Sequence, residues 1–416
     1  MALRLLLRVA SLAAKFGLTI AVARALGFAA VGEYGLAVAV SVIASKLCGL
    51  GFSAELNRQL SGPTSKAAIE TARGLRAVYV GFYLISGAGL LAASLGGWST
   101  EYSASVATVG FVLLVAASEH YALEVNTYVF SVHRSRAGSS MLFARTGGWA
   151  AIAIVGLLIG LVKDIHTVFV LWIVSNVGVT FWAWMLLSRL ASRHGEAAVR
   201  DVPLATQLRT TWTAGVHFYI GGVLLAGLQY AERFIATAWL PAAEVGRYVF
   251  MWSVANAVQT VAYATVGVIA GPRLARAAGA TDVAWRETFR KSLRTTIGVS
   301  VTTAAGIACA APIIFWTTKE RTTPAALLTI SILLASFMLR SIGDLLWWAS
   351  VARRARQRIV LGMCVAASVA LPISLWLIPG HGVVEVALAH LLGSVTVLVA
   401  LFWAQRGGVV GEHDNV

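Results

Sequence analysis

The chain has 416 residues, of which 58% are hydrophobic and only 12% are charged. A soluble domain carries about 25% charged residues, so this composition excludes an ordinary soluble protein. It predicts an all-α protein that crosses a membrane many times. The net charge is +15, but most basic residues fall in short loops on one side of the predicted helices. Membrane topology therefore explains the charge, and we expect no nucleic-acid partner.

Apolar runs of the length of a membrane-spanning helix recur along the whole chain. Such a helix needs about 20 predominantly apolar residues. The sequence predicts twelve of them, near residues 5–26, 34–56, 77–96, 104–130, 146–162, 167–187, 213–239, 246–270, 295–316, 324–350, 359–378 and 383–404. The run at 146–162 is short unless it begins nearer Met141. The first run has no clear cleavage site, so we expect it to be retained.

Basic residues determine the expected orientation. They gather in the loops near 57–76, 188–212 and 271–294, and Arg145 is assigned to the same side because it precedes the fifth run. This asymmetry predicts that both termini face the cytoplasm.

The two halves of the chain resemble each other. VGEYGLAVAVS at 31–41 matches VGRYVFMWSVA at 245–255, and TARGLR at 71–76 matches TFRKSLR at 288–294. A third match aligns His120 with Arg340 and Glu124 with Asp344. Three matches in the same order predict two six-helix halves, residues 1–200 and 201–416, related by a pseudo-two-fold axis along the membrane normal.

Two lysines interrupt the first two apolar runs. Lys15 lies about ten residues into the first run, and Lys46 lies about twelve residues into the second, which goes the other way. We therefore expect both at a similar depth. A charge at the centre of a spanning helix costs about 2.5–3.5 kcal/mol, so two such charges predict a hydrated cationic cavity. The alternative for each lysine is that it extends to the membrane interface.

Two arginines are further candidates for binding an anionic substrate. Arg24 is expected at the outer end of the first helix, where it either contributes to binding or only anchors the helix. Arg233 is expected in the seventh helix, near its end. It either binds substrate, extends to the interface or pairs with a neighbour such as Glu232.

Further charges fall within the predicted spans. Arg340 and Asp344 are four residues apart on one helix and can pair. His120 and Glu124 occupy the corresponding place in the first half. Two interpretations remain open for these four residues, namely a structural ion pair and a proton or ion relay.

Motifs for covalent chemistry are absent from the sequence. It contains no GxxxxGK[ST] phosphate loop and no His/Cys cluster with metal-ligand spacing. Cys48, Cys309 and Cys364 lie in apolar runs and are expected to pack as small hydrophobic residues. We therefore expect no catalytic residue, no metal ion, no cofactor and no enzyme activity.

The segment 23–62 carries a resemblance to a known family. It contains Ala23-Arg24-x-Leu26-Gly27, then Gly32-x-Tyr34-Gly35, then Gly49-Leu50-Gly51. This pattern is similar to the first two helices of bacterial polysaccharide flippases of the multidrug/oligosaccharidyl-lipid/polysaccharide exporter superfamily. The stretch GLQYAERFIATAWLPAAEVGRYVF at 227–250, followed by Pro272, also resembles that family.

The resemblance implies a V-shaped bundle of two six-helix halves around a central cationic cavity, in the bacterial cytoplasmic (inner) membrane. It implies transfer of an undecaprenyl-diphosphate-linked glycan from the inner to the outer leaflet, for O-antigen, capsule or exopolysaccharide synthesis. The implied partners are this lipid-linked glycan and membrane lipids, with a glycan polymerase and other assembly proteins as an open addition.

Several alternatives remain. Twelve helices favour a polysaccharide flippase over the peptidoglycan-precursor flippases of this superfamily, which usually have fourteen, but they do not exclude the latter. An ion-coupled exporter of small molecules is another possibility. Drug-exporting relatives often carry an acidic residue in the first helix, whereas this chain has Lys15 there. A membrane scaffold without transport activity is the last alternative.

Overall fold

The computed structural model describes residues 2–61, 65–95, 106–193, 204–318, 320, 322–353 and 355–406. All regular secondary structure in these ranges is helical, which confirms the predicted all-α class. The chain divides into two compact units, Met1–Tyr219 and Ile220–Val416. The predicted boundary between residues 200 and 201 lies outside the described residues.

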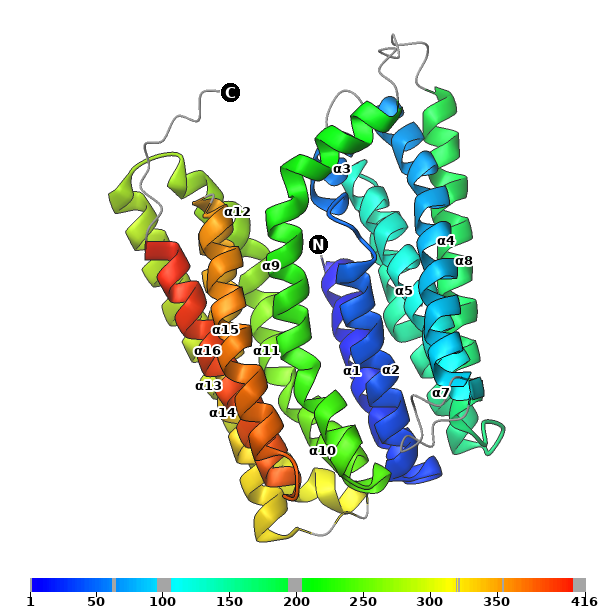
Figure 1. Ribbon diagram of the computed structural model, residues 1–416, viewed down its shortest axis with the longest axis vertical. Helices are drawn as coiled ribbons and strands as arrows, with labels where there is room; N and C mark the ends of the chain where they lie inside the picture. The colour runs from blue at the N-terminus through cyan, green and yellow to red at the C-terminus, as the bar shows by residue number, and fades with distance from the viewer. Residues whose placement is uncertain are drawn as a thin grey trace. The chain divides into compact units, whose positions relative to one another are not determined.

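The first unit is an assembly of long helices with one broken span and one π-helical segment. Within it, α5 packs against α2 and α8 (Figure 1). α1 packs along α7. Its elements are α1 (Ala2–Leu26), α2 (Phe28–Leu47), α3 (Ser53–Leu60), α4 (Ser65–Leu95), α5 (Val106–Ser131), α6 (Ser135–Phe143), η1 (Ala144–Gly148), α7 (Trp149–Leu158), α8 (Ile165–Arg193) and the first part of α9 (Leu204–Trp239).

The second unit contains the rest of α9 and the remaining helices. α14 packs against α16, which in turn packs against α15, and α13 packs along α14. The elements are α10 (Ala242–Ala255), α11 (Ala257–Ala262), η2 (Tyr263–Gly267), α12 (Val268–Ala278), α13 (Asp282–Thr317), α14 (Pro324–Ala352), α15 (Arg356–Leu377) and α16 (Val383–Arg406).

Each of the twelve predicted spans coincides with a helix or a run of helices. Within the described residues, ten helices are long and apolar enough to cross a membrane, and Ala242–Gly267 with Ile269–Ala278, bent by 48°, form an eleventh crossing if counted as one span. The remaining predicted span corresponds to α9, which has 36 residues but carries Glu232 and Arg233 in its apolar part. Large apolar side chains on the outer face of α4 are exposed, such as Ile85 at 77%, which is typical of a surface in contact with lipid.

The fifth span begins earlier than the apolar run suggests. It extends from Ser135 to Leu158 through α6, η1 and α7, so it has the length that the run at 146–162 lacks.

The next helix, α8, begins at a polar cap. The backbone N–H of Thr167 donates a hydrogen bond to Asp164 Oδ1 at 2.9 Å. This hydrogen bond lowers the pKa of the Asp164 carboxyl, which lies in the loop.

The second span is interrupted where the sequence predicts a continuous helix. α2 ends at Leu47, and α3 begins at Ser53. Between them Leu50 has φ +50° and Gly51 has φ +85°, the left-handed region that glycine tolerates and that costs other residues free energy. The Tyr219 hydroxyl of α9 donates to the Leu47 carbonyl at 2.9 Å. α9 therefore supports the interruption from the side.

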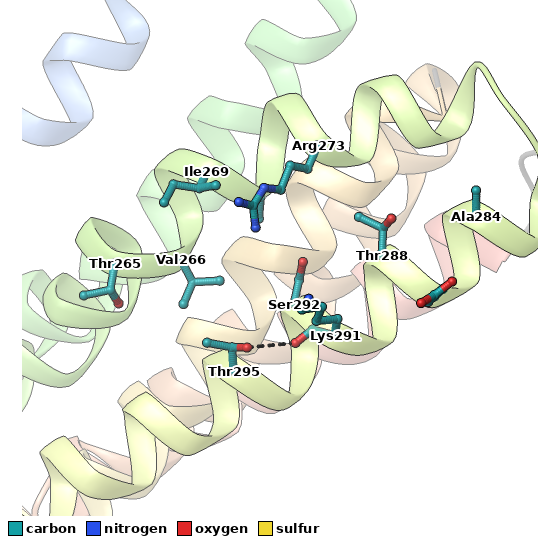
Figure 2. Close-up of a pocket in the computed structure, with 11 residues that line it drawn as sticks. Thr265, Val266, Ile269, Arg273, Ala284, Thr288, Lys291, Ser292 and Thr295 are labelled. Atoms are coloured by element: carbon teal, nitrogen blue, oxygen red, sulfur yellow. Dashed lines mark hydrogen bonds between the residues drawn. The ribbon is translucent and has the colours of Figure 1, made fainter.

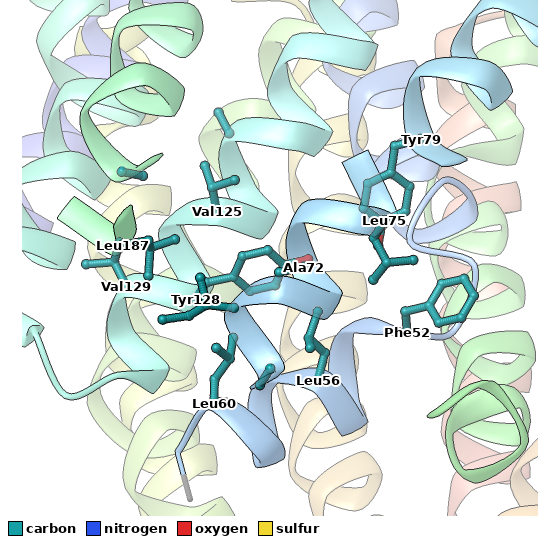
Figure 3. Packing of buried hydrophobic residues seen from close by; sticks show 14 of the residues in the cluster. Phe52, Leu56, Leu60, Ala72, Leu75, Tyr79, Val125, Tyr128, Val129 and Leu187 are labelled. Atoms are coloured by element: carbon teal, nitrogen blue, oxygen red, sulfur yellow. The ribbon is translucent and has the colours of Figure 1, made fainter. Parts of the chain in front are cut away.

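A hydrophobic cluster holds α3, the helix after this interruption, against the rest of the first unit. Phe52, Leu56 and Leu60 pack with Leu75 and Tyr79 of α4 (Figure 3). Val125, Tyr128 and Val129 of α5 and Leu187 of α8 complete the cluster. The broken second span is thus fixed by packing on three neighbouring helices.

The close approach of α9 to the interruption gives a direct stability prediction. A Cβ on Gly215 would lie 2.2 Å from the Gly51 carbonyl oxygen, whereas a Cβ on Gly222 of the same helix meets nothing within 4 Å. We expect Gly215→Ala to lower the melting temperature of the purified protein by several degrees, a cost of about 1–3 kcal/mol. Gly222→Ala is the matched control and should be neutral or stabilising, because alanine favours a helix by about 0.5–1 kcal/mol. Equal melting temperatures for the two variants would contradict the contact.

Candidate functional site

α5 brings two carboxylates and a histidine into the interior of the first unit. Glu119 is 8% exposed, His120 0% and Glu124 5%. Residues four apart lie on the same side of a helix, so His120 and Glu124 point in one direction, toward α3 and α4. Glu119 points instead toward η1 and α8. α5 therefore supports two separate polar clusters.

The first cluster is built on an ion pair between Glu119 and Arg145. Arg145, on the π-helical segment η1, is 5% exposed and donates to Glu119 Oε1. The other carboxylate oxygen accepts a hydrogen bond from Trp172 Nε1 of α8 at 2.9 Å. The Trp172 indole stacks on that of Trp149, with ring centroids 5.0 Å apart. Both oxygens of Glu119 are thus occupied in a site closed by aromatic rings.

Lys15 of α1 lies beside this pair. It is half-buried and interacts electrostatically with both Glu119 and Arg145. Its ammonium group forms neither a hydrogen bond nor an ion pair with any residue that the structure describes. Since one carboxylate faces two cations, the cluster carries an excess of one positive charge.

The placement of Arg145 corrects the topology assignment made from the sequence. Arg145 was expected in a cytoplasmic loop, but it lies inside the span from Ser135 to Leu158. The error arose because the fifth span was predicted to begin after Arg145. The short length of that run was the only signal in the sequence that the helix begins earlier.

The second cluster surrounds Glu124 and His120. Ser53, the first residue of α3, donates to Glu124 Oε1 at 2.5 Å. His120 Nε2 lies 3.9 Å from the same carboxylate oxygen, and its Nδ1 is hydrogen-bonded to the Tyr83 hydroxyl of α4. The residues form a chain of polar groups, from Tyr83 through His120 to Glu124.

Lys46 lies next to this second cluster and not at the middle of a helix. It occupies the last turn of α2 and is exposed, because the helix ends at Leu47. The expectation of a mid-span position is therefore wrong. Lys46 interacts electrostatically with Glu124, but its ammonium group makes no ion pair in the described part of the chain. A cation in the last turn also interacts favourably with the helix dipole.

Arg24 occupies the last turn of α1 and is exposed. The position agrees with the expected helix end. It fits the role of a helix anchor at least as well as a role in binding.

In the second unit, Glu232 and Arg233 are enclosed by aromatic residues. Arg233 is 1% exposed, and its guanidinium lies 3.8 Å from the ring centroid of Trp252 and 4.9 Å from that of Tyr230. Glu232 accepts a hydrogen bond from the Tyr248 hydroxyl at 2.9 Å. Cation–π contacts of this kind stabilise a buried arginine by about 2 kcal/mol or more when desolvated. Arg233 therefore contributes to the packing of this unit.

The expected ion pair between Arg340 and Asp344 is not formed. Arg340 Nε donates to Ser394 Oγ at 2.9 Å, and its Nη2 donates to the Leu228 carbonyl at 3.1 Å. Asp344 Oδ2 instead accepts from Gln259 Nε2 at 2.9 Å. Arg340 thus joins α14 to α9 and α16, and Asp344 joins α14 to α11. Spacing alone allowed the pair, but partners on neighbouring helices are used instead.

The structure brings the candidate residues together in part. Each predicted lysine lies within electrostatic range of one α5 carboxylate, Lys15 of Glu119 and Lys46 of Glu124. Arg24 is in neither cluster. Across the described ranges no group of three or more His, Cys, Asp or Glu residues could hold a metal ion. The first unit thus places two ammonium groups near buried carboxylates, and it hydrogen-bonds Tyr83 to His120 beside Glu124.

Comparisons with known proteins identify the fold. No protein-family description matches the sequence, and no curated protein matches it either. Among solved structures, the chain is similar to the lipid II flippase MurJ in an inward closed conformation, with a TM-score of 0.70 and 10% identity over 98% of this chain and 88% of that one. It is also similar to an inward-facing multidrug resistance MATE family transporter of the MOP superfamily, with a TM-score of 0.69 and 12% identity over 97% of both chains.

A third solved structure agrees with these two. It is a mutant of the Vibrio cholerae MATE transporter VcmN, with a TM-score of 0.60 and 14% identity over 98% of both chains. The chain therefore shares the fold of these flippase and transporter structures.

Removal of either partner of the Glu119–Arg145 pair should destabilise the first unit. Arg145→Gln leaves a buried carboxylate beside an indole, and breaking a buried pair costs about 3–5 kcal/mol. We expect the single variants Arg145→Gln and Glu119→Gln to lower the melting temperature strongly. The double variant should recover much of the lost melting temperature, because it leaves neither a buried carboxylate nor a buried guanidinium without its partner. Strictly additive losses would contradict direct coupling of the two residues.

Proposed function

We propose that the protein is a flippase that transfers a polyprenyl-diphosphate-linked oligosaccharide between the leaflets of a bacterial cytoplasmic membrane. The MOP superfamily fold supports a flippase or exporter. The observation that carries the proposal is that Lys15 and Lys46 have no ion-pair partner in the described residues, although a buried carboxylate lies near each. Free ammonium groups of this kind suit a ligand with two or more negative charges.

The proposed mechanism uses these ammonium groups to hold the diphosphate. Charge-assisted hydrogen bonds from Lys15 and Lys46 to phosphate oxygens replace the hydration that the diphosphate loses. The sugars remain hydrated and the polyprenyl tail stays in lipid. The proposed order is entry from the cytoplasm, alternation of the two halves and release outside. No covalent bond is formed or broken. Arg24 and Arg233 are secondary candidates, of which the exposed Arg24 is more accessible.

Two glycan classes are equally supported as the cargo. The likeness to MurJ favours a peptidoglycan lipid precursor, and the sequence resemblance favours a polysaccharide precursor such as O-antigen, capsule or exopolysaccharide. In both, the group beside the polyprenyl chain is a diphosphate. Neighbouring genes for glycosyltransferases or a glycan polymerase would favour the polysaccharide class.

Neutralising the lysines should slow flipping in proteoliposomes that contain a fluorescent polyprenyl-diphosphate glycan. A hydrogen bond to a charged group contributes about 1.5–3 kcal/mol, and about 1.4 kcal/mol corresponds to a factor of ten. We therefore expect Lys15→Ala and Lys46→Ala each to reduce the initial rate about tenfold, and the double variant to reduce it further. Lys163→Ala, an exposed lysine in the loop before α8, is the matched control and should retain the wild-type rate.

The same assay distinguishes the two cargo classes. Rates with a peptidoglycan-type headgroup and with a polysaccharide repeat unit should differ at equal lipid concentration, and the faster substrate identifies the class. If both single variants and the double variant flip at the wild-type rate, the lysines have no role in binding.

A second candidate function is ion-coupled export of small molecules. It is favoured by the likeness to MATE transporters and by the buried polar chain of Tyr83, His120 and Glu124. On this hypothesis these three polar side chains relay a proton through the first unit. In the flippase hypothesis the same residues only link α4, α5 and α3.

Replacement of the histidine separates these two roles. If the side chains of Tyr83, His120 and Glu124 relay protons, an imposed pH gradient should no longer stimulate transport by the His120→Gln variant. The transport rate of this variant without a gradient should be nearly that of the wild type. Transport in the wild type and in Ser118→Ala, a hydroxyl on the same helix, should keep its gradient dependence. Equal gradient dependence of His120→Gln and the wild type would exclude the relay.

A further inference from the structure

A cleft opens between α12 and α13 in the second unit, away from the residues discussed above. It has a volume of about 430 Å³ and lies where η2 passes into α12. Arg273 extends from α12 into the gap, and Ser292 faces it from α13, with Lys291 next to it (Figure 2). Val266 and Ile269 line the other end. The cleft therefore has a basic end, which also carries the Glu287 carboxylate, and an end that is mainly apolar, where Thr265 and Thr295 lie beside Val266.

The cations at the basic end are free. Neither Arg273 nor Lys291 forms a side-chain hydrogen bond or an ion pair with the residues that the structure describes. Glu287 also lines the cleft, and it forms no ion pair with them. The hydroxyl-bearing residues Thr288 and Ser292 lie on the same face of α13. Two free cations with hydroxyl groups between them are the donors that a phosphate group requires.

The apolar end lies deeper along both helices. Arg273 precedes the end of α12 at Ala278 by five residues, whereas Val266 lies in the preceding η2 segment. At a rise of about 1.5 Å per residue, roughly 10 Å separate the two along the axis. The headgroup region of a bilayer leaflet is about 5–8 Å thick. A ligand that is charged at one end and apolar at the other fits this spacing, whereas free phosphate uses only the basic end.

We propose that this cleft binds the phosphate of an anionic phospholipid, with its headgroup between Arg273 and Lys291 and its acyl chains along Val266 and Ile269. The site is separate from the proposed cargo site. Its charge is not only a general topology signal, because Arg286 and Arg290 lie on the same helix and contribute equal charge without lining the cleft. These two arginines provide a control of identical charge change.

Thermal unfolding of the purified chain in detergent tests the proposal with added phosphatidylglycerol, phosphatidylcholine or inorganic phosphate. We expect phosphatidylglycerol to raise the melting temperature of the wild type by several degrees and the other two to have little effect. Arg273→Gln/Lys291→Gln should lose most of this shift, with an apparent affinity at least tenfold weaker. Arg286→Gln/Arg290→Gln should keep it. Neither double substitution removes a side-chain hydrogen bond or ion pair among the described residues that line the cleft.

Three results would overturn the proposal. Equal stabilisation by inorganic phosphate would show an anion site without lipid preference, and equal loss in the two double variants would show charge attraction alone. Retention of the shift in Ser292→Phe, which places a bulky ring in the cleft and keeps both cations, would place the lipid elsewhere. Native mass spectrometry of the same variants gives the bound lipid directly. Since no transport is measured, failure here leaves the proposed flippase activity unaffected, and the reverse also holds.

Discussion

A charge inside a low-dielectric helix bundle must be partnered, and the Glu119–Arg145 pair shows how this chain meets that constraint. Either group alone would lose several kcal/mol of hydration. Here Arg145 and Trp172 occupy both oxygens of the carboxylate. The contacts come from η1 and α8, so the position of α5 is fixed relative to two other helices. The π-helical segment matters because it places the arginine inside the span instead of at its end. The packing of the first unit depends on this arrangement.

The second unit meets the same constraint by different means. Arg340 uses a serine hydroxyl and a backbone carbonyl, and Arg233 lies against two aromatic rings. Glu232 and Asp344 each have a neutral hydrogen-bond donor, Tyr248 and Gln259. Each charge there is tied to a helix other than its own. A residue held in this way supports the fold, and binding a ligand with it would require these contacts to change. Among these buried charges of the described residues, the one that remains free for a ligand is therefore in the first unit, on Lys15, with the exposed Lys46 in the same unit.

The sequence predicted helix class and span positions well because apolar runs separated by basic loops leave few alternatives. The sequence was less informative about where individual helices begin and end. Arg145 was placed outside the membrane because nothing in its immediate sequence shows that the helix begins at Ser135. Lys46 was placed at mid-span because the run from 34 to 56 is continuously apolar, whereas the backbone leaves the helix at Cys48 and adopts positive φ at Leu50 and Gly51. The Arg340–Asp344 pair failed for another reason. Helical spacing shows which residues can meet on one helix, but the partners come from α9, α11 and α16, which no local pattern reveals.

The charge balance of the first unit leads from structure to function. Its two α5 carboxylates lie near three cations, Lys15, Lys46 and Arg145, and within the described residues Arg145 is the one of these that forms an ion pair. A surplus cation in a membrane protein is costly unless water or an anion reaches it. A permanent internal partner would have been the simpler solution for stability alone, as Arg145 itself shows. The unpaired ammonium group of the half-buried Lys15 therefore supports the proposed external, exchangeable anion, whereas the exposed Lys46 is already accessible to water. In the proposed mechanism a diphosphate supplies negative charge for both lysines, and repulsion from the nearby carboxylates would weaken its binding and so favour release.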